Sequence, residues 1–135
     1  MLNFKMVKSF TMFKNRKQAA LLLAGALKKY TSDDVIVVGI PKYKTVIIVD
    51  DGIATGATVF ATIKMCRKRG AAKIVVASPV CAITTADELR LEADEVVVLE
   101  MPERFFSVSQ YYESFHDLTY NEAVEFLEKW KKDLA

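Results

Sequence analysis

The stretch Val46–Thr58 reads Val-Ile-Ile-Val-Asp-Asp-Gly-Ile-Ala-Thr-Gly-Ala-Thr, and the rest of the chain is organised around it. Its first part, Val46–Val49, is a continuous β-branched run, which is typical of a strand buried on both faces of a parallel sheet. Two carboxylates, Asp50 and Asp51, follow at the carboxyl end of that strand, where open α/β sheets bind their ligands. The stretch therefore predicts a strand, an acidic strand end, and a loop that opens into a helix.

The loop after the two acids has the composition of an anion-binding site. It consists of Gly52, Ile53, Ala54, Thr55, Gly56, Ala57 and Thr58. Small residues let the backbone approach a ligand closely, and the N–H groups of the following helix point at the loop, so a phosphate is the natural occupant. Carboxylates beside it accept hydrogen bonds from sugar hydroxyls. A ribose 5-phosphate meets both conditions, whereas the alternative is an ordinary strand-to-helix turn with an Asp cap.

These residues resemble the phosphoribosyl diphosphate (PRPP) signature of the type I phosphoribosyltransferases. In that family the paired acids hold the ribose hydroxyls, and the loop amides and threonine hydroxyls hold the 5-phosphate. The resemblance implies that Asp50 and Asp51 bind the ribose and that Thr55–Thr58, completed by Gly52–Ala54, bind the phosphate. Further along, the chain is similar to a bacterial and archaeal subgroup of this family whose substrate is unidentified.

The resemblance also implies a reaction and a metal ion. Family members displace pyrophosphate at the ribose anomeric carbon, so catalysis depends on positioning the reactants, stabilising the leaving group and excluding water. Mg²⁺ is held mostly through PRPP and water, so we expect no metal-ligating cluster in the protein itself. The expected partners are PRPP or a nucleotide and an acceptor base that the sequence does not identify. No catalytic residue is identified either.

The composition predicts one soluble domain over residues 1–135. The chain is 52% hydrophobic and 27% charged with a net charge of +2, so no basic field points to nucleic acid as the main partner. No apolar run approaches the roughly eighteen residues of a membrane span, and a secretory leader is not indicated, so we expect a cytoplasmic protein. Cys66 and Cys81 lack metal or disulfide spacing and are expected to be reduced.

Strand-like and helix-like segments alternate along the chain. Buried-looking runs predict strands at Val35–Ile40, Val46–Val49, Lys73–Ser78 and Glu95–Leu99. Helical spacing of apolar residues predicts helices over Phe13–Tyr30, Ala57–Arg69, Thr85–Leu91 and from Thr119 onward. This alternation is typical of right-handed parallel crossovers. We expect an α/β fold of the phosphoribosyltransferase type, a three-layer α/β/α sandwich whose mainly parallel sheet is reduced at one edge.

Two helices begin with capping-box patterns. Thr85 pairs with Glu88, and Thr119 pairs with Glu122. The helix that follows Thr119 is expected to pack on the domain through an apolar face. That face comprises Ala123, Val124, Phe126, Leu127 and Trp130.

The segment before Val46 departs from the family pattern. In the relatives the strand corresponding to Val35–Ile40 leads into a pyrophosphate loop and further strands, whereas here Pro41–Thr45 runs straight into the signature. Parallel neighbours need a crossover of a dozen or more residues. Five residues span at most roughly 16 Å, and returning along a six-residue strand takes about 20 Å. We therefore expect an antiparallel hairpin; the alternatives are exchange into a second subunit, which gives a homodimer, or departure from the sheet.

This missing segment leaves more than one function open. The resemblance favours a phosphoribosyltransferase, while a non-catalytic binder of PRPP or a nucleotide would also explain a chain without a pyrophosphate loop. A gene remnant is the third explanation. Lys42 and Lys44 are the nearest substitutes for the lost pyrophosphate contacts, although paired lysines in a short turn are usually just solvated.

Other polar and aromatic residues receive the plainer interpretation. Asn15 or Thr11 is expected to cap the first helix, and Arg16 is expected to be a solvated first-turn residue, although the subgroup carries an arginine there. The lone His116 is expected at the surface or at a helix cap. An aromatic cluster is expected to pack in the core rather than to stack on a base. Its members are Phe105, Phe106, Tyr111, Tyr112 and Phe115.

Overall fold

A computed structural model describes residues 12–30, 35–36 and 44–134 of the chain. Its helices and strands alternate, as the sequence pattern predicts. In chain order they are α1 (Arg16–Ala26), the 3₁₀ turn η1 (Lys28–Tyr30), β1 (Val35–Ile36), β2 (Thr45–Val49), α2 (Ala57–Lys68), β3 (Lys73–Val80), α3 (Ile83–Glu92), β4 (Glu95–Glu100), the 3₁₀ turn η2 (Val108–Tyr111) and α4 (Tyr120–Leu134).

The described strands form one parallel sheet in the order β1-β2-β3-β4. Thr45 lies opposite Lys73 and Val49 opposite Ala77, so β2 is paired along its whole length. β3 is the central strand, and every residue after Lys73 in it is buried. A strand buried on both faces reads as a continuous apolar run, which is why Lys73–Val80 carries no alternation of polar and apolar residues.

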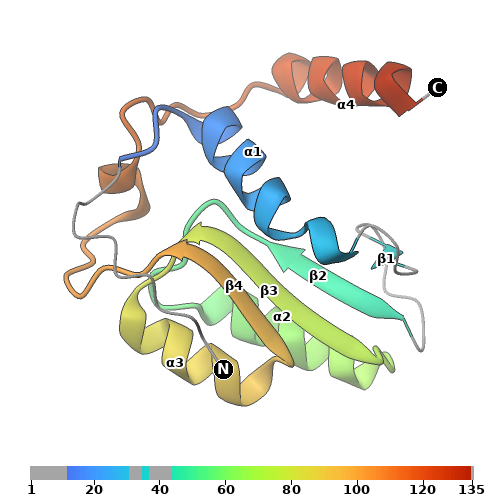
Figure 1. The fold of residues 1–135 in the computed structure, drawn as a ribbon, viewed down its shortest axis with the longest axis vertical. Coiled ribbons are helices and arrows are strands. Elements are labelled where there is room, and N and C mark those ends of the chain that lie inside the picture. The colour runs from blue at the N-terminus through green and yellow to red at the C-terminus, as the bar shows by residue number, and fades with distance from the viewer. Residues whose placement is uncertain (1–11, 31–34, 37–43, 135) are drawn as a thin grey trace.

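The sheet is covered on both faces, so the predicted three-layer α/β/α fold is confirmed. α1 lies across one face, and α2 and α3 lie side by side on the other (Figure 1). The crossover through α2 places β3 beside β2, and the crossover through α3 places β4 on the same side of β3. Right-handed crossovers that advance in one direction place their helices on one face. The N-terminal α1 is left to cover the opposite face.

Two apolar cores fill the space between the layers. The larger lies between the sheet and the pair α2 and α3, and it includes Ile63, Ile74 and Leu89. The smaller lies on the α1 side at the carboxyl end of the sheet, where Phe13 and Tyr111 pack with Val80. This second core ties the segment after β4 to the start of α1, and both segments therefore reach the acidic strand end.

The expected antiparallel hairpin is wrong. β1 pairs with β2 in parallel within one chain, with Val35 opposite Thr45 and Ile36 opposite Val46. The error lay in the assumed strand length, because only two residues pair and the chain has to return by only about 3 Å along the strand. The eight residues 37–44 can span roughly 30 Å. Residues 37–40 of the predicted strand lie outside the described residues.

Two further sequence predictions need correction. Strand β3 continues through Pro79 to Val80. Pro79 has no backbone N–H to donate, but β2 ends opposite Ala77, so no β2 hydrogen bond is lost at Pro79. Thr85 caps no helix. It lies in the first turn of α3, whose N-cap is Ala82, and its side chain is buried.

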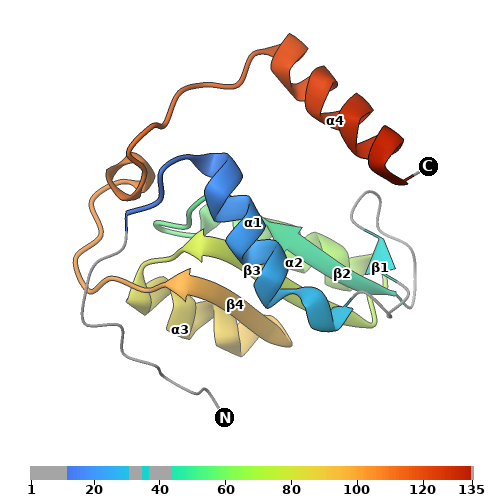
Figure 2. The ribbon, with the colours of Figure 1, turned by 45° about the horizontal axis from the view of Figure 1, so that its top comes forward.

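The capping box at Thr119 is confirmed, but the packing expected of its helix is not. The Thr119 hydroxyl accepts from the Glu122 N–H at 3.2 Å, and the Glu122 carboxylate accepts from the Thr119 N–H at 2.8 Å. α4 nevertheless stands away from the layers (Figures 1 and 2). Phe126 and Leu127 are exposed on it, and the Trp130 side chain lies outside the described part of the chain. No helix among the described residues is long and apolar enough to cross a membrane.

Candidate functional site

Strand β2 carries the acid pair to the carboxyl edge of the sheet, and backbone hydrogen bonds hold the loop that follows. The Asp50 N–H donates to the Ala77 carbonyl at 3.2 Å, which extends the β2–β3 ladder by one residue. Ile53 is fixed at both its polar groups, because its N–H donates to Val80 at 2.9 Å and its carbonyl accepts from Ala82 at 3.0 Å. Its side chain is buried in the core. Ile53 is therefore the anchor of the loop; Gly52 before it is also buried, whereas Ala54 and Thr55 after it are exposed.

The two acids are half-buried neighbours with different surroundings. The Asp50 carboxylate accepts a hydrogen bond from the Asp51 N–H at 2.8 Å. Burial raises the pKa of the Asp50 carboxyl, and the negative charge of Asp51 raises it further, although the hydrogen bond from the Asp51 N–H opposes the rise. The pair thus places two carboxylates at one strand end, where they can accept hydrogen bonds from the vicinal hydroxyls of a sugar.

Arg16 is part of this site, so the expectation of a solvated residue is wrong. Its Nε donates to Asp51 Oδ2 at 2.9 Å, and its Nη1 donates to the His116 carbonyl at 2.6 Å. The guanidinium also lies 3.8 Å from the centre of the Phe115 ring. The residue at the start of α1 is therefore held on three sides. Only the resemblance to the subgroup pointed to it, because the spacing of Arg16 from Asp51 in the sequence carries no signal.

The aromatic segment after β4 supports the acid pair from the other side. The Tyr112 hydroxyl donates to the Asp51 carbonyl at 2.6 Å. Burial and the nearby negative charge of Asp51 raise the pKa of Tyr112 to about 12, so it remains a donor at neutral pH. Tyr111 and Tyr112 are buried, which confirms packing for these two, whereas Phe106 is exposed. His116 lies at the surface, with its Nε2 3.8 Å from the Glu122 carboxylate.

The second half of the loop opens into α2 without a side-chain cap. Gly56 is the N-cap residue and has φ 77°, a left-handed conformation that side chains rarely adopt. Within the described part of the chain, no hydrogen bond is recorded from the N–H groups of residues 54–58. Ala54, Thr55, Ala57 and Thr58 are exposed. The helix start therefore presents free donors and two hydroxyls on one surface, which is the arrangement that binds phosphate.

Neighbouring elements fix the shape of this loop. The Thr85 hydroxyl of α3 donates to the Ala54 carbonyl at 2.5 Å, which explains why that threonine is buried in a helix. A Cβ on Gly56 would lie 2.9 Å from the Thr85 methyl group. A Cβ on Gly52 would lie 2.5 Å from Cγ1 of Val108, in η2. Both glycines are thus required by close packing, and Gly56 is required by its backbone conformation as well.

A cavity of about 280 Å³ lies beside the acids, between α1 and the carboxyl ends of β2 and β3. Its walls combine the acid pair and Arg16 with apolar side chains. They comprise Arg16, Ala20, Leu23, Val49, Asp50, Asp51, Pro79 and Tyr112. The cavity is a shallow concave surface that includes the two carboxylates.

The acid pair fits a magnesium ion that is held chiefly by its ligand. The described residues contain no cluster of three or more metal-ligating side chains. Mg²⁺ is commonly bound by one or two carboxylates together with the phosphates of a substrate. Asp50 and Asp51 supply such carboxylates, although Arg16 already occupies one oxygen of Asp51. Of the two lysines suggested as substitutes for the pyrophosphate contacts, Lys42 lies outside the described residues. Lys44 lies at the opposite end of β2 from the two acids, where its carbonyl accepts from the Ala72 N–H.

Comparison with known proteins identifies the family. The phosphoribosyl transferase domain family matches residues 25–114, which is more than half of the chain. The chain therefore belongs to the phosphoribosyl transferase domain family, and the fold and the signature loop agree with that class. The match includes the acid pair and the loop, while Arg16 lies before it.

Individual relatives agree with the family. Two proteins of Mycobacterium tuberculosis, from strains CDC 1551 / Oshkosh and H37Rv, are named "Putative phosphoribosyl transferase"; each is 43% identical over 89 residues, which is 66% of this chain and 20% of the relative. The crystal structure of TT1426 from Thermus thermophilus is 31% identical with a TM-score of 0.60, and the match covers 84% of this chain and 53% of that one. The chain thus spans about a fifth of the length of the Mycobacterium relatives and about half of the Thermus structure.

Proposed function

We propose that the chain binds PRPP, or a nucleotide, through its ribose 5-phosphate part and transfers the phosphoribosyl group to an acceptor base. The observation that carries this proposal is the junction of β2 and α2. There the two carboxylates and the uncapped helix start stand next to each other on one loop. A sugar that carries both hydroxyls and a phosphate is the ligand that uses both features.

The roles follow from the chemistry of each group. Asp50 and Asp51 accept hydrogen bonds from the ribose hydroxyls, and Arg16 and Tyr112 hold Asp51 in place. The N–H groups of residues 54–58 and the hydroxyls of Thr55 and Thr58 donate to the 5-phosphate. Mg²⁺ bound through PRPP oxygens and these acids would offset the negative charge gathered at the site. Transfer then depends on holding the anomeric carbon and the base in line.

The phosphate role is tested by calorimetric titration of ribose 5-phosphate into Gly56→Val. We expect at least about a tenfold loss of affinity, because a side chain is strained at this φ and its Cβ would collide with Thr85 and Phe60, which forces the loop to shift. Gly25→Ala is the matched control, since no atom lies within 4 Å of a Cβ there. Unchanged affinity in Gly56→Val would place the phosphate elsewhere.

The ribose role is tested with a 2,3-dideoxy analogue of the same ligand. Each hydrogen bond to a charged carboxylate is worth about 1.5–3 kcal/mol, so loss of both hydroxyls should weaken binding by at least about a hundredfold. Equal affinity for the two sugars would remove the acids from the binding site. The loop would then be left as a simple anion site.

Transfer itself is tested by pyrophosphate release from PRPP and Mg²⁺ in the presence of a panel of purine and pyrimidine bases. We expect release with at least one base. The alternative is a non-catalytic binder. The observation on its side is the short connection before β2, which stands where family members carry a pyrophosphate loop. Tight binding of PRPP without pyrophosphate release from any base would assign the chain to that class instead.

A further inference from the structure

A second, larger cavity adjoins the one beside the acid pair. It is a groove of about 770 Å³ between α1 and α4. Arg16 and Ala20 line this groove, and they also line the cavity of about 280 Å³ that Asp50 and Asp51 border. The two spaces are therefore neighbours at the start of α1. The roles proposed above use only the smaller one, which leaves the groove without an occupant.

The acceptor of a phosphoribosyl group has to lie next to the ribose. Its ring nitrogen supplies the electron pair of the new C–N bond at the anomeric carbon, pyrophosphate leaves with the pair of the broken C–O bond, and the ring N–H proton passes to water. The nitrogen must first come within about 3.5 Å of that carbon. The anomeric carbon neighbours the carbon that carries the 2-hydroxyl, so the acceptor sits close to the acids that hold that hydroxyl. The groove meets this condition.

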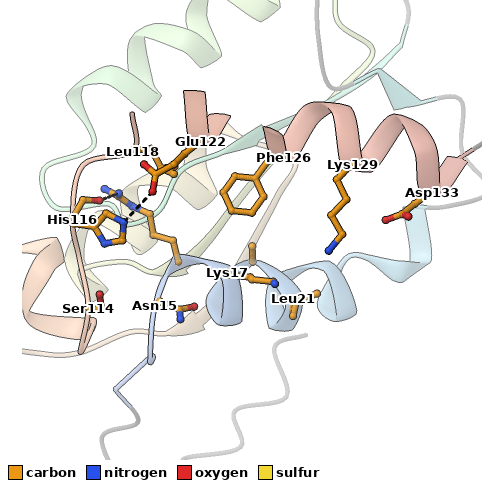
Figure 3. A pocket seen from close by; sticks show the side chains of 12 residues that line it. Asn15, Lys17, Leu21, Ser114, His116, Leu118, Glu122, Phe126, Lys129 and Asp133 are labelled. Carbon is orange, nitrogen blue, oxygen red and sulfur yellow. Dashed lines mark hydrogen bonds and ion pairs between the residues drawn. The ribbon is translucent and has the colours of Figure 1, made fainter. Parts of the chain in front are cut away.

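The middle of the groove has apolar walls that suit a flat ring. Phe126 faces α1 from α4, and Leu21 lies on the opposite wall (Figure 3). Phe126 is 52% exposed and Leu21 67%, so both side chains keep free surface for a ligand. Heteroaromatic rings stack on the face of a phenylalanine ring. A diphosphate gains nothing from such walls, because charged groups lose hydration there.

Charge selects among flat rings. Lys17 lies on α1, and Lys129 points from α4 toward it (Figure 3). Within the part of the chain that the structure describes, neither ammonium group has a recorded hydrogen bond or ion pair. Of the two acids that line the groove, Asp133 lies one helical turn after Lys129, whereas Glu122 is engaged at the helix cap, where it accepts from the Thr119 N–H at 2.8 Å. The cations therefore outweigh the one remaining acid, and an anionic substituent is favoured here.

We propose that the groove between α1 and α4 is the acceptor site, and that the acceptor is a flat nitrogen heterocycle that carries a carboxylate. The ring stacks on Phe126 with its nitrogen toward Arg16, and the carboxylate meets Lys17 and Lys129. This inference rests on the proposed function and adds a substrate class to it. The class excludes neutral bases as the preferred acceptors.

The first test is calorimetric titration of two matched pairs of heterocycles. The pairs are uracil with its 6-carboxylate, orotate, and imidazole with imidazole-4-carboxylate. Saturating ribose 5-phosphate fills the sugar site during the titration and cannot react, because it has no pyrophosphate to lose. We expect the acid of at least one pair to bind at least about tenfold more tightly than its neutral partner. Equal affinity within both pairs would overturn the assigned class.

The second test locates the site with variants of α4. Phe126→Ala should weaken both members of the preferred pair about tenfold, because the stacking surface is lost. Leu127→Ala is its control, since Leu127 is an exposed neighbour that is not among the described residues lining the groove. Circular dichroism checks that each variant is folded. Unchanged affinity for both ligands in Phe126→Ala would exclude the groove.

A lysine pair tests the charge in the same way. Lys129→Gln should weaken the acid about fivefold and leave its neutral partner unchanged, because one cation is removed. Lys131→Gln is the matched control, since Lys131 is an exposed lysine of the same helix outside the groove lining. If Lys129→Gln instead lowers the preference for PRPP over ribose 5-phosphate and spares the acid, the groove binds the diphosphate and the proposal is wrong.

Ribose 5-phosphate is titrated into every variant, which separates this inference from the function it rests on. Phe126 and Lys129 are not among the described residues that line the ribose cavity, so its affinity should stay within about twofold. A parent chain that binds ribose 5-phosphate but neither acid would overturn the acceptor site alone. A parent chain that does not bind ribose 5-phosphate would overturn the proposed function, and the acceptor site with it.

Discussion

At the scale of single residues, the acid pair and Arg16 form a unit whose parts come from distant points of the chain. Arg16 lies 35 positions before Asp51 and 100 before His116, and it bonds to both. A carboxylate that must accept a sugar hydroxyl works best when its orientation is already fixed. The guanidinium and the Tyr112 hydroxyl provide that fixation.

Arg16→Gln tests this positioning role. Loss of the charged bond to Asp51 should weaken binding of ribose 5-phosphate by about tenfold, while binding of inorganic phosphate should stay unchanged, because the loop is untouched. Lys17→Gln is the neighbouring control, since Lys17 is exposed. Calorimetric titration of both ligands distinguishes the outcomes, and an equal loss for sugar phosphate and free phosphate would indicate a general collapse of the site.

We expect Asp50 to lower the stability of the folded chain at neutral pH and to strengthen the binding of ribose. Because burial raises its pKa in the folded state, the folded chain binds more protons than the unfolded chain between the ordinary and the raised pKa. This contribution to stability is therefore present at low pH and is lost as the pH rises through the raised value. Asp50→Asn should raise the thermal midpoint slightly at neutral pH and weaken ribose binding. A lowered midpoint at pH 7 would contradict the assignment.

At the scale of elements, the signature loop takes its shape from what packs behind it. Ile53 is bonded between β3 and the start of α3, and Gly52 touches Val108 of η2. The loop is thus held by the crossovers on one side and by the aromatic segment on the other. A change in η2 should therefore reach the site without altering a binding residue.

Gly52→Ala tests this contact. A Cβ 2.5 Å from Cγ1 of Val108 forces the β-branched side chain or the loop to move, so we expect a loss of about 1–3 kcal/mol in the free energy of unfolding. Val108→Ala in the same chain should recover part of the loss. Chemical denaturation of the single and double variants completes the cycle. Simple additivity of the two losses would show that the two residues do not compete for the same space.

At the scale of the whole molecule, we expect the three layers to fold without help from α4. Among the side chains that the structure describes, neither apolar core has a member beyond Phe115. A chain that ends at Asp117 should keep its free energy of unfolding to within about 1 kcal/mol in dilute solution, because surface changes far from the core cost little. Denaturant titration checks this expectation, and a loss of several kcal/mol would mean that α4 packs on the layers.

The sequence by itself determined the layers and the loop. A β-branched run that ends in two acids and a small-residue loop has one low-energy arrangement in an α/β sheet, and the alternation of strands and helices fixes the handedness of the crossovers. Local chemistry also placed the start of α4, because the capping box at Thr119 and Glu122 involves residues only three apart. These features depend on neighbours in sequence, so sequence reasoning reaches them.

Only the tertiary structure decided the pairing of β1, the role of Arg16 and the position of α4. Only Val35 and Ile36 pair with β2, so the connecting chain has to run back only a short distance along the strand, and parallel pairing becomes possible. Arg16 meets Asp51 only because α1 crosses the sheet at its carboxyl edge. The apolar face of α4 predicts that something covers it, yet periodicity cannot say what does. All three depend on long-range contacts, which local patterns do not encode.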